Sequence, residues 1–258
     1  MDNRAIGVYD SGMGGITLWR AIRTFLPNES MIYLGDGANC PYGDKSSEEI
    51  TTLAFQAVQT LIDKGCKMVV VACNTATSAA ISALRLKFPQ IPFVGMEPAI
   101  KPACKSTKSG VVAVLATKRS LESDLFAATL SKYAAEIKVI KVIGEGFVDI
   151  VENGQEKSEK AFELVKPIVE MIASKGADKI VLGCTHYPFL TSQFIRAIDG
   201  RHIDIVEPSS AIVKQIAKLL EEFNIKAAYD ADLQDEFITF ASEEYRKRLM
   251  YKAKDVIF

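Results

Sequence analysis

Short apolar runs alternate with longer amphipathic stretches along the chain. The runs are continuously apolar rather than alternating, which is typical of strands that are buried on both faces of a parallel sheet. The expected strands are Ala5–Tyr9, Met31–Leu34, Met68–Val71, Pro92–Val94, Val111–Leu115, Ile137–Val142, Lys179–Leu182 and Ile203–Val206. Because helical patterns lie between them, the sequence predicts the doubly wound α/β class with mainly parallel sheets.

Helical periodicity is clearest in two segments. Residues 46–64 carry an apolar stripe with a 3.6-residue period, and Ser46 with Glu49 forms a capping box at its start. A second amphipathic helix is expected to begin near Ser209. Residues 230–244 are acidic and only loosely periodic. We interpret them as a helix that packs back on the first part of the chain.

Two segments of the chain repeat each other's layout. Residues 69–75 and 180–186 both contain three branched apolar residues, one small residue, a cysteine and two polar residues. The strand that ends at Asp10-Ser11 is mirrored, at a similar spacing, by the strand that ends at Ala116-Thr117. This double correspondence predicts two related halves that face each other.

The composition places the chain among ordinary globular proteins. Its 258 residues are 48% hydrophobic and 24% charged, which excludes the disordered and fibrous classes. With 31 basic and 32 acidic side chains the formal net charge is -1, so no chain-wide attraction draws the protein to nucleic acid or to an anionic membrane. We expect neither of these as a direct partner.

The cysteines and the N-terminal residues indicate the compartment. The first residues lack the apolar core of a secretory signal, and no stretch approaches the roughly 18 apolar residues of a membrane span. The five cysteines are odd in number and form no CxxC pair, which fits reduced thiols rather than a disulfide framework. We therefore expect a cytoplasmic protein in which a special cysteine is reactive rather than structural.

Cys73 and Cys184 follow predicted strands at corresponding places in the two halves. Backbone N–H groups and the N-terminus of the next helix stabilise a thiolate at such a place. Either cysteine alone could be a small packed hydrophobic residue, but the matched pair favours chemistry. One thiol could remove a proton from carbon while the other, on the opposite wall of a cleft, returns one to the opposite face without a cofactor. Asp10 and His186 are the expected orienting groups.

Two loops offer groups for a small polar ligand. Residues 10–15 follow the first strand, precede a helical run and are rich in glycine, which is typical of an anion-binding turn. A dinucleotide site with Asp36 on the ribose is the alternative, but Thr17 occupies the third glycine position and Asp10 would repel pyrophosphate. The loop of residues 35–43 adds backbone donors and a phenol.

Four motifs together resemble the glutamate racemases of bacteria: Ile6–Gly15, Pro41–Gly43, Val71–Thr77 and Leu182–Leu190. The resemblance runs in order from residue 6 to about residue 224. It implies a cofactor-independent, two-base racemisation that supplies D-glutamate for peptidoglycan and thus for the cell wall and cell shape. It also implies that Cys73 deprotonates D-glutamate and that Cys184 deprotonates L-glutamate.

The same resemblance implies further site residues by matching motif. Asp10, His186 and Glu152 would assist proton transfer, Glu152 lying in the least distinctive of these stretches. The residues that would hold the ammonium and carboxylate groups of the substrate are Asp10, Ser11, Pro41, Tyr42, Gly43, Asn74, Thr75, Thr117, Thr185 and His186. No metal is implied.

The resemblance further implies two domains, residues 1–97 plus 207–258 and residues 98–206, with the active site in the cleft between them. A homodimer is also implied. The chain departs from the family pattern at Gly37, Asn39 and Cys40, where threonine, arginine and valine are common, and this leaves the shape of that loop open. After Thr117, residues 118–120 replace a smaller stretch.

Four alternatives stay open at this level. Aspartate and hydantoin racemases share the cysteine pair, so the substrate depends on motif details. A partner-binding relative, such as a regulator of DNA gyrase, would use the basic residues within 245–254, which also suit a solvated helix face. A hydrolase built on Cys184 and His186 lacks a third orienting group in the sequence and leaves Cys73 without a role. A metal site would combine these three residues, and activity in the presence of strong chelators would exclude it.

Overall fold

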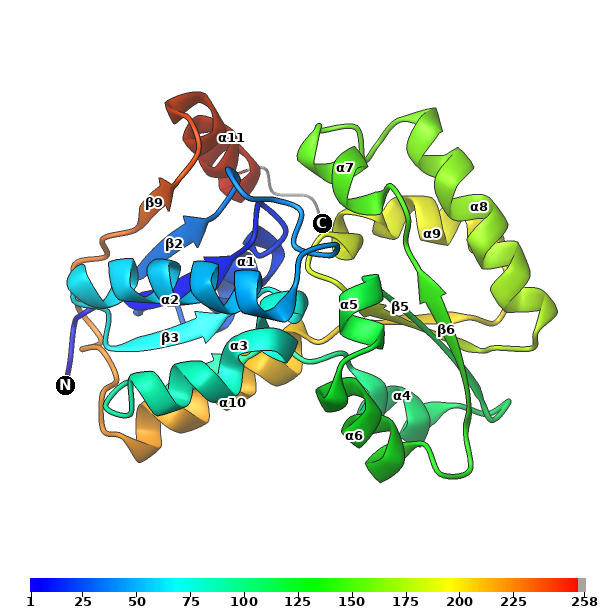
Figure 1. Cartoon of the computed structure of the whole chain (residues 1–258), viewed down its shortest axis with the longest axis horizontal. Helices are drawn as coiled ribbons and strands as arrows, with labels where there is room; N and C mark the ends of the chain where they lie inside the picture. Colours follow the sequence, from blue (N-terminus) through cyan, green and yellow to red (C-terminus); the bar gives the residue numbers. More distant parts are fainter. Residues whose placement is uncertain (255–258) are drawn as a thin grey trace. The chain divides into compact units, whose positions relative to one another are not determined.

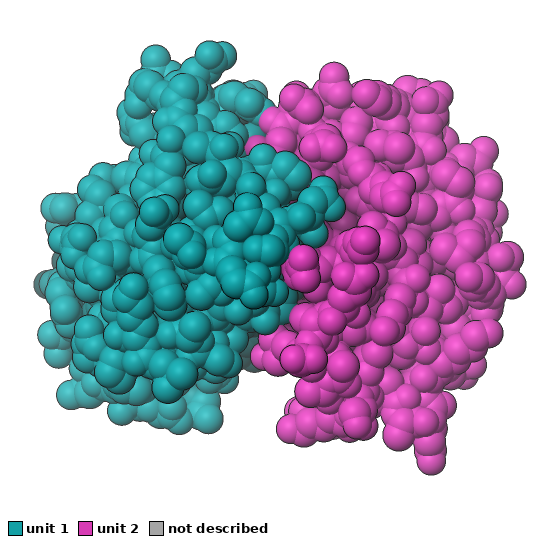
Figure 2. Space-filling model, in the orientation of Figure 1, with its two compact units in different colours: residues 1–96, 209–258 teal, residues 97–208 magenta. Residues whose placement is uncertain are grey.

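Every strand pairing in the structure is parallel, as the continuously apolar strands predicted. The computed structural model describes residues 1–254. The strands form two sheets in two units, which Figure 2 distinguishes by colour: unit 1 is Met1–Met96 with the chain from Ser209 onward, and unit 2 is Glu97–Pro208. The prediction of two doubly wound α/β domains is confirmed. The chain passes between units after residues 96 and 208, where the sequence analysis expected 97 and 206.

Unit 1 is built on a five-stranded sheet with the order β4-β3-β1-β2-β9. Its strands are β1 (Ile6–Asp10), β2 (Met31–Gly35), β3 (Met68–Val71), β4 (Phe93–Gly95) and β9 (Glu236–Thr239). The helices of this unit are α1 (Ile16–Phe25), α2 (Ser47–Asp63), α3 (Asn74–Lys87), α10 (Ser209–Glu222) and α11 (Glu243–Lys254).

Helices cover both faces of this sheet. Apolar residues of α2 and α3 form one core with Tyr9, Val69 and Val71, and Figure 1 shows these two helices side by side. On the other face α1 packs against α10 and α11. The expected cap of α2 is confirmed, since the Ser46 side chain accepts from the Glu49 N–H and the Glu49 side chain accepts from the Ser46 N–H.

Unit 2 has a four-stranded sheet with the order β6-β5-β7-β8. Its strands are β5 (Val111–Ala116), β6 (Lys138–Ile143), β7 (Lys179–Gly183) and β8 (Asp204–Val206). Its helices are α4 (Ile100–Ser106), α5 (Lys118–Leu121), α6 (Asp124–Tyr133), α7 (Phe147–Glu152), α8 (Glu159–Ser174), the 3-10 helix η1 (Tyr187–Leu190) and α9 (Thr191–Ile198). Helices α4, α5 and α6 share a core with β5 and β7.

The two sheets repeat one topology. In chain order, the first four strands of unit 1 are arranged 4-3-1-2, and the four strands of unit 2 are arranged in the same way when the sheet is read from β8 to β6. Strand β3 thus corresponds to β7, and β1 corresponds to β5. The internal repeat predicted from the sequence is confirmed, and β9 is an addition to unit 1.

The interpretation of residues 230–244 as a helix was wrong. This segment contains β9, which pairs in parallel with β2 at the edge of the sheet (Figure 1). Phe237 is its buried residue, and its ring lies 5.2 Å from that of Trp19 and 5.9 Å from that of Tyr33, measured between centroids. One inward aromatic residue in a strand of four residues is too little to produce a readable period, so packing rather than local pattern sets this strand.

Within residues 1–254, no helix combines the length and the apolarity that crossing a bilayer requires.

Replacement of Phe237 by alanine tests whether β9 is an integral part of unit 1. Since the ring is buried between Trp19 and Tyr33, we expect Phe237→Ala to lower the free energy of unfolding by about 3–4 kcal/mol. Phe25→Ala removes the same side chain from a site that is 64% exposed and should change it by less than about 0.5 kcal/mol. Urea unfolding measures both variants, and equal losses would contradict the packing role of Phe237.

Candidate active site

Cys73 lies between the end of β3 and the start of α3. It is the N-cap residue of α3, and its sulfur accepts from the Ala76 N–H at 3.4 Å. Its thiol also donates to Ser11 Oγ at 3.4 Å. The side chain is buried. A sulfur at the N-terminus of a 14-residue helix lies in the positive field of that helix, which stabilises a thiolate.

The turn after β1 brings Asp10 and Ser11 to the same end of the sheet. The fully buried Asp10 carboxylate accepts from the Gly12 N–H at 3.1 Å. The following helix begins so close to the strand that a Cβ on Gly15 would lie 2.8 Å from that of Asp10. The tight turn therefore requires glycine at this position, and it holds Ser11 beside Cys73.

The loop after β2 is held by a buried hydrogen-bond network. Tyr9 donates its hydroxyl to Tyr42 at 2.9 Å, and Tyr42 donates to an Asp36 carboxylate oxygen at 2.6 Å. The Asn39 side-chain amide donates to the same carboxylate at 2.9 and 3.1 Å. Burial raises the pKa of Tyr42, so its hydroxyl stays protonated. The phenol that we expected to contact a ligand thus donates its hydrogen bond within the loop.

Asp36 has no role as a ribose ligand. Its side chain is fully buried and accepts from Tyr42 and Asn39. The dinucleotide alternative therefore lacks the acidic residue that it needs to bind the ribose. Sequence analysis missed the positioning roles of Asp36 and Tyr9. The signal that could have found them is a carboxylate directly after a buried strand, three residues before an amide and six before a phenol.

The first turn of α3 carries the other predicted residues of unit 1. Asn74 and Thr75 are both buried. The Asn74 amide donates to the Met96 carbonyl at 3.4 Å. Thr77 donates to the Val71 carbonyl and accepts from the Met96 N–H, both at 3.1 Å. These bonds fix the start of α3 to the ends of β3 and β4.

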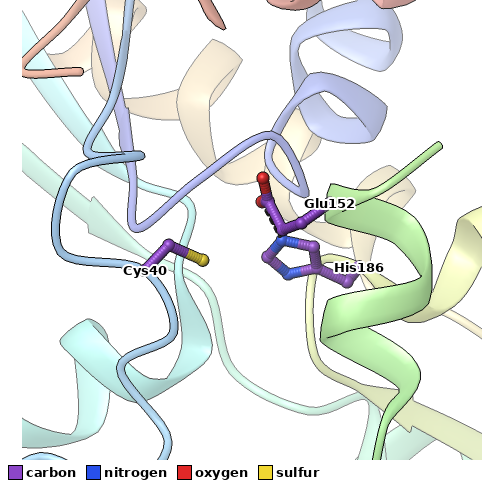
Figure 3. Close-up of side chains that lie close together, drawn as sticks. All are labelled: Cys40, Glu152 and His186. Atoms are coloured by element: carbon purple, nitrogen blue, oxygen red, sulfur yellow. Dashed lines mark hydrogen bonds and ion pairs between the residues drawn. The ribbon is translucent and has the colours of Figure 1, made fainter. Parts of the chain in front are cut away.

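In unit 2 the thiol of Cys184 is the first of three side chains that lie in a row. Cys184 Sγ lies 3.8 Å from His186 Nδ1, and His186 Nε2 lies 2.7 Å from a Glu152 carboxylate oxygen, the pair joined by a dashed line in Figure 3. A carboxylate accepts a hydrogen bond, so Nε2 carries a proton, and in the neutral imidazole Nδ1 presents its lone pair to the sulfur. Thr185 and His186 are both buried.

Aromatic packing explains how Glu152 reaches His186. Phe147 of α7 makes edge-on contacts with Tyr187 of η1 and Phe194 of α9, at centroid distances of 5.2 and 5.9 Å. These contacts hold α7 against the turn that follows Cys184, and Glu152 is the last residue of α7. The acid–imidazole pair is therefore supported by a rigid apolar cluster.

Strand register gives each thiol a hydroxyl neighbour of the same kind. Tyr9 pairs with Val71 in unit 1, and two residues further along stand Ser11 and Cys73. Leu115 pairs with Leu182 in unit 2, and two residues further along stand Thr117 and Cys184. The Thr117 hydroxyl also caps α5, accepting from the Ser120 N–H and donating to Ser120 Oγ. Each unit thus presents a thiol and a hydroxyl on adjacent strand ends.

Comparison with known proteins agrees with this arrangement. The family model described as Asp/Glu/Hydantoin racemase matches residues 17–216. The protein belongs to this racemase family. A glutamate racemase of Roseiflexus sp. is 45% identical over 219 residues, which cover 85% of this chain and 80% of that protein. A glutamate racemase of Ectopseudomonas mendocina is 41% identical over 226 residues, covering 88% of this chain and 86% of its own.

Solved racemase structures share the whole fold. A glutamate racemase isoform of Bacillus anthracis superposes with a TM-score of 0.87 at 30% identity, covering 98% of this chain and 94% of its own. The Francisella tularensis glutamate racemase in complex with D-glutamate gives a TM-score of 0.85 at 28% identity, covering 99% and 95%. The similarity therefore extends over both units.

Membership of the racemase family also resolves the hydrolase alternative. The sequence argument against it was the lack of a third orienting group, and this argument was wrong, because Glu152 occupies that place beside His186. The relatives are racemases, and a hydrolase would leave the matched thiol of Cys73 unexplained.

Two further cysteines of this racemase, Cys66 and Cys104, have thiols whose pKa is raised. Burial raises the pKa of the Cys66 thiol to about 12, and burial also raises the pKa of Cys104. Cys66 packs beneath β1, within 3.2 Å of the position that a Cβ on Gly7 would take. It is a structural thiol.

Alkylation separates structural from functional thiols. Because burial raises its pKa to about 12, Cys66 is almost wholly protonated at pH 8, and we expect iodoacetamide to leave it unmodified in the native protein. In denaturant its pKa returns to the ordinary range and it reacts. Peptide mass spectrometry measures the modification, with the half-buried Cys104 as the faster internal control. Rapid alkylation of native Cys66 would contradict its assignment as structural.

Proposed function

We propose that this racemase interconverts L-glutamate and D-glutamate without a cofactor, with Cys73 and Cys184 as the two proton-transferring groups. The observation that carries the proposal is the equivalence of the two thiols. Each follows the corresponding strand of a repeated topology, is buried, and lies beside its own polar partner. The names of the relatives supply the substrate.

The chemistry follows from two thiols of opposite protonation state. With L-glutamate bound, the Cys184 thiolate takes the α-proton, and the electron pair of the C–H bond stays on the α-carbon. The Cys73 thiol then gives its proton to the opposite face, which leaves Cys73 as the thiolate and Cys184 as the thiol. The reverse direction exchanges these roles, so no atom or electron is lost.

His186 and Glu152 together accept and return the thiol proton of Cys184. The Nδ1 lone pair faces the sulfur at 3.8 Å and accepts the thiol proton when the thiolate is needed. Glu152, at 2.7 Å from Nε2, stabilises the imidazolium that results and keeps the ring in the required tautomer. On the Cys73 side, the Ala76 N–H donates a hydrogen bond to the sulfur, and Asp10 assists proton transfer.

The substrate is held by groups that each unit presents at its strand ends. We assign its carboxylates to the N-terminus of α3, where Asn74 and Thr75 begin the helix, and to the backbone of Tyr42 and Gly43. Negative Asp10 suits the ammonium group. The hydroxyls that contribute are those of Ser11, Thr117 and Thr185, and Pro41 shapes the loop.

Biological context forms part of the proposal. D-glutamate is a component of peptidoglycan, so the product would serve cell-wall synthesis. We further propose a homodimer and a cytoplasmic location, the latter supported by five free cysteines, which suit a reducing compartment. No direct role for nucleic acid is proposed.

The decisive experiment follows L-glutamate in D2O with the chelator-treated protein. We expect loss of the α-proton signal in NMR together with decay of the circular dichroism of the amino acid. Unchanged glutamate would overturn the substrate assignment, and the same test with aspartate and hydantoins would then identify which racemase this is.

The cysteine variants test the two-base scheme. Cys73→Ala and Cys184→Ala should each lower kcat for racemisation by at least roughly 100- to 10,000-fold, because each direction needs both a thiolate and a thiol. Cys66→Ala removes a buried thiol from the same unit as Cys73 and should retain kcat within about twofold. Circular dichroism spectra verify folding. Full activity in Cys73→Ala or in Cys184→Ala would contradict the two-base scheme.

Glu152 tests the acid–imidazole pair. Glu152→Gln retains the size of the side chain but cannot stabilise an imidazolium, so we expect kcat to fall by roughly 100-fold with little change in KM. Glu145→Gln, on an exposed residue shortly before α7, is the matched control and should retain kcat. Steady-state kinetics in both directions measure the effect. A kcat equal in both variants would remove Glu152 from the mechanism.

A further inference from the structure

Helix α11 lies against the loop that follows β2. A Cβ built on Gly37 would lie 2.4 Å from both Cε1 and Cζ of Tyr245 and 2.8 Å from its Cδ1. The backbone at Gly37 does not have a positive φ, so conformational freedom is not what calls for glycine here. The space that a side chain at position 37 would occupy is filled by the tyrosine ring.

The ring is held in place because α11 is anchored along its inner face. One turn after Tyr245, Leu249 is fully buried, and its Cδ1 lies 3.2 Å from the position that a Cβ on Gly35 would take. Near the end of the helix, the Arg20 guanidinium of α1 donates to the Lys252 carbonyl. Helix α11 also packs against β9, so the ring is presented by a fixed helix rather than by a loose terminus.

The contact falls on the loop that carries substrate-binding backbone. Gly37 directly follows Asp36, whose carboxylate accepts from Tyr42 and Asn39. The segment of Pro41–Gly43 follows within a few residues. A shift of Gly37 would therefore move the amides of Tyr42 and Gly43, and misplacement by about 1 Å is enough to weaken a site strongly.

The contact accounts for the lack of a side chain at position 37. A β-branched side chain there would collide with Tyr245. Asn39, two residues further along, donates its amide to Asp36. Gly37 and Asn39 are thus parts of one local arrangement.

We propose that Tyr245 is a positioning residue that fixes the substrate loop of residues 36–43 from the C-terminal helix. This inference rests on the proposed function for the identity of the substrate. The ring acts through its contact with Gly37.

The test compares two tyrosines on one helix. Tyr245→Ala should raise KM for glutamate by about tenfold and change kcat by less than about twofold, since binding groups move while the thiols stay. Tyr251→Ala removes an identical side chain that is 71% exposed and should leave KM unchanged. Tyr245→Phe, which keeps the ring, should restore the wild-type KM. An unchanged KM in Tyr245→Ala would overturn the proposal.

Hydrogen exchange gives a readout that does not depend on activity. We expect the amides of residues 37–43 to exchange several-fold faster in Tyr245→Ala than in the wild-type protein or in Tyr251→Ala. If the wild-type protein fails to racemise glutamate, the proposed function fails, while this exchange difference still tests the contact. Equal exchange in all three proteins would overturn the proposed positioning role of Tyr245.

A second variant approaches the contact from the loop side. Gly37→Ala should raise KM in the wild-type background, because the methyl group collides with the ring, and should have little further effect in Tyr245→Ala. If Tyr245→Ala alone unfolds, the single variant Gly37→Ala decides the matter, since a wild-type KM in that variant would overturn the proposal.

Discussion

The parallel pairing of two strands in each unit is the constraint on which the rest of the site depends. Pairing of β1 with β3 and of β5 with β7 sets which residues emerge side by side at the carboxyl ends. A slip of one residue in either pairing would exchange inward and outward side chains. The register is secured because these strands are buried on both faces, so a thiol and a hydroxyl emerge together in each unit without any contribution from a long loop.

Around this frame, the polar groups of the site are buried or half-buried and are paired. A buried carboxylate without partners would cost several kcal/mol, yet the buried Asp36 accepts from a phenol and an amide. The half-buried Glu152 accepts from the buried imidazole of His186. Such networks have one low-energy arrangement. They hold the loop of residues 36–42 in unit 1 and the imidazole of unit 2 in place, which lowers the reorganisation that binding and reaction at the proposed site would require.

The sequence revealed what depends on local pattern and missed what depends on packing. Cys73 and Cys184 could be predicted as proton-transferring residues because a strand, a small residue and a cysteine are contiguous in the chain. The pairing of Glu152 with His186 could not, since an aromatic cluster formed by residues far apart brings α7 to that turn. β9 was missed for the same reason, because its burial comes from Trp19 and Tyr33 rather than from its own period.

The position of β9 and α11 at the end of the chain has a consequence for synthesis. When the ribosome has made residues 1–208, unit 2 is complete, but unit 1 lacks α10, β9 and α11. Until β9 pairs with it, β2 is an edge strand with unpaired backbone groups, which invites pairing with other chains. Domains generally fold in the order in which they emerge, but here the unit whose synthesis starts first is completed last, and the edge of β2 stays unpaired until β9 has been made.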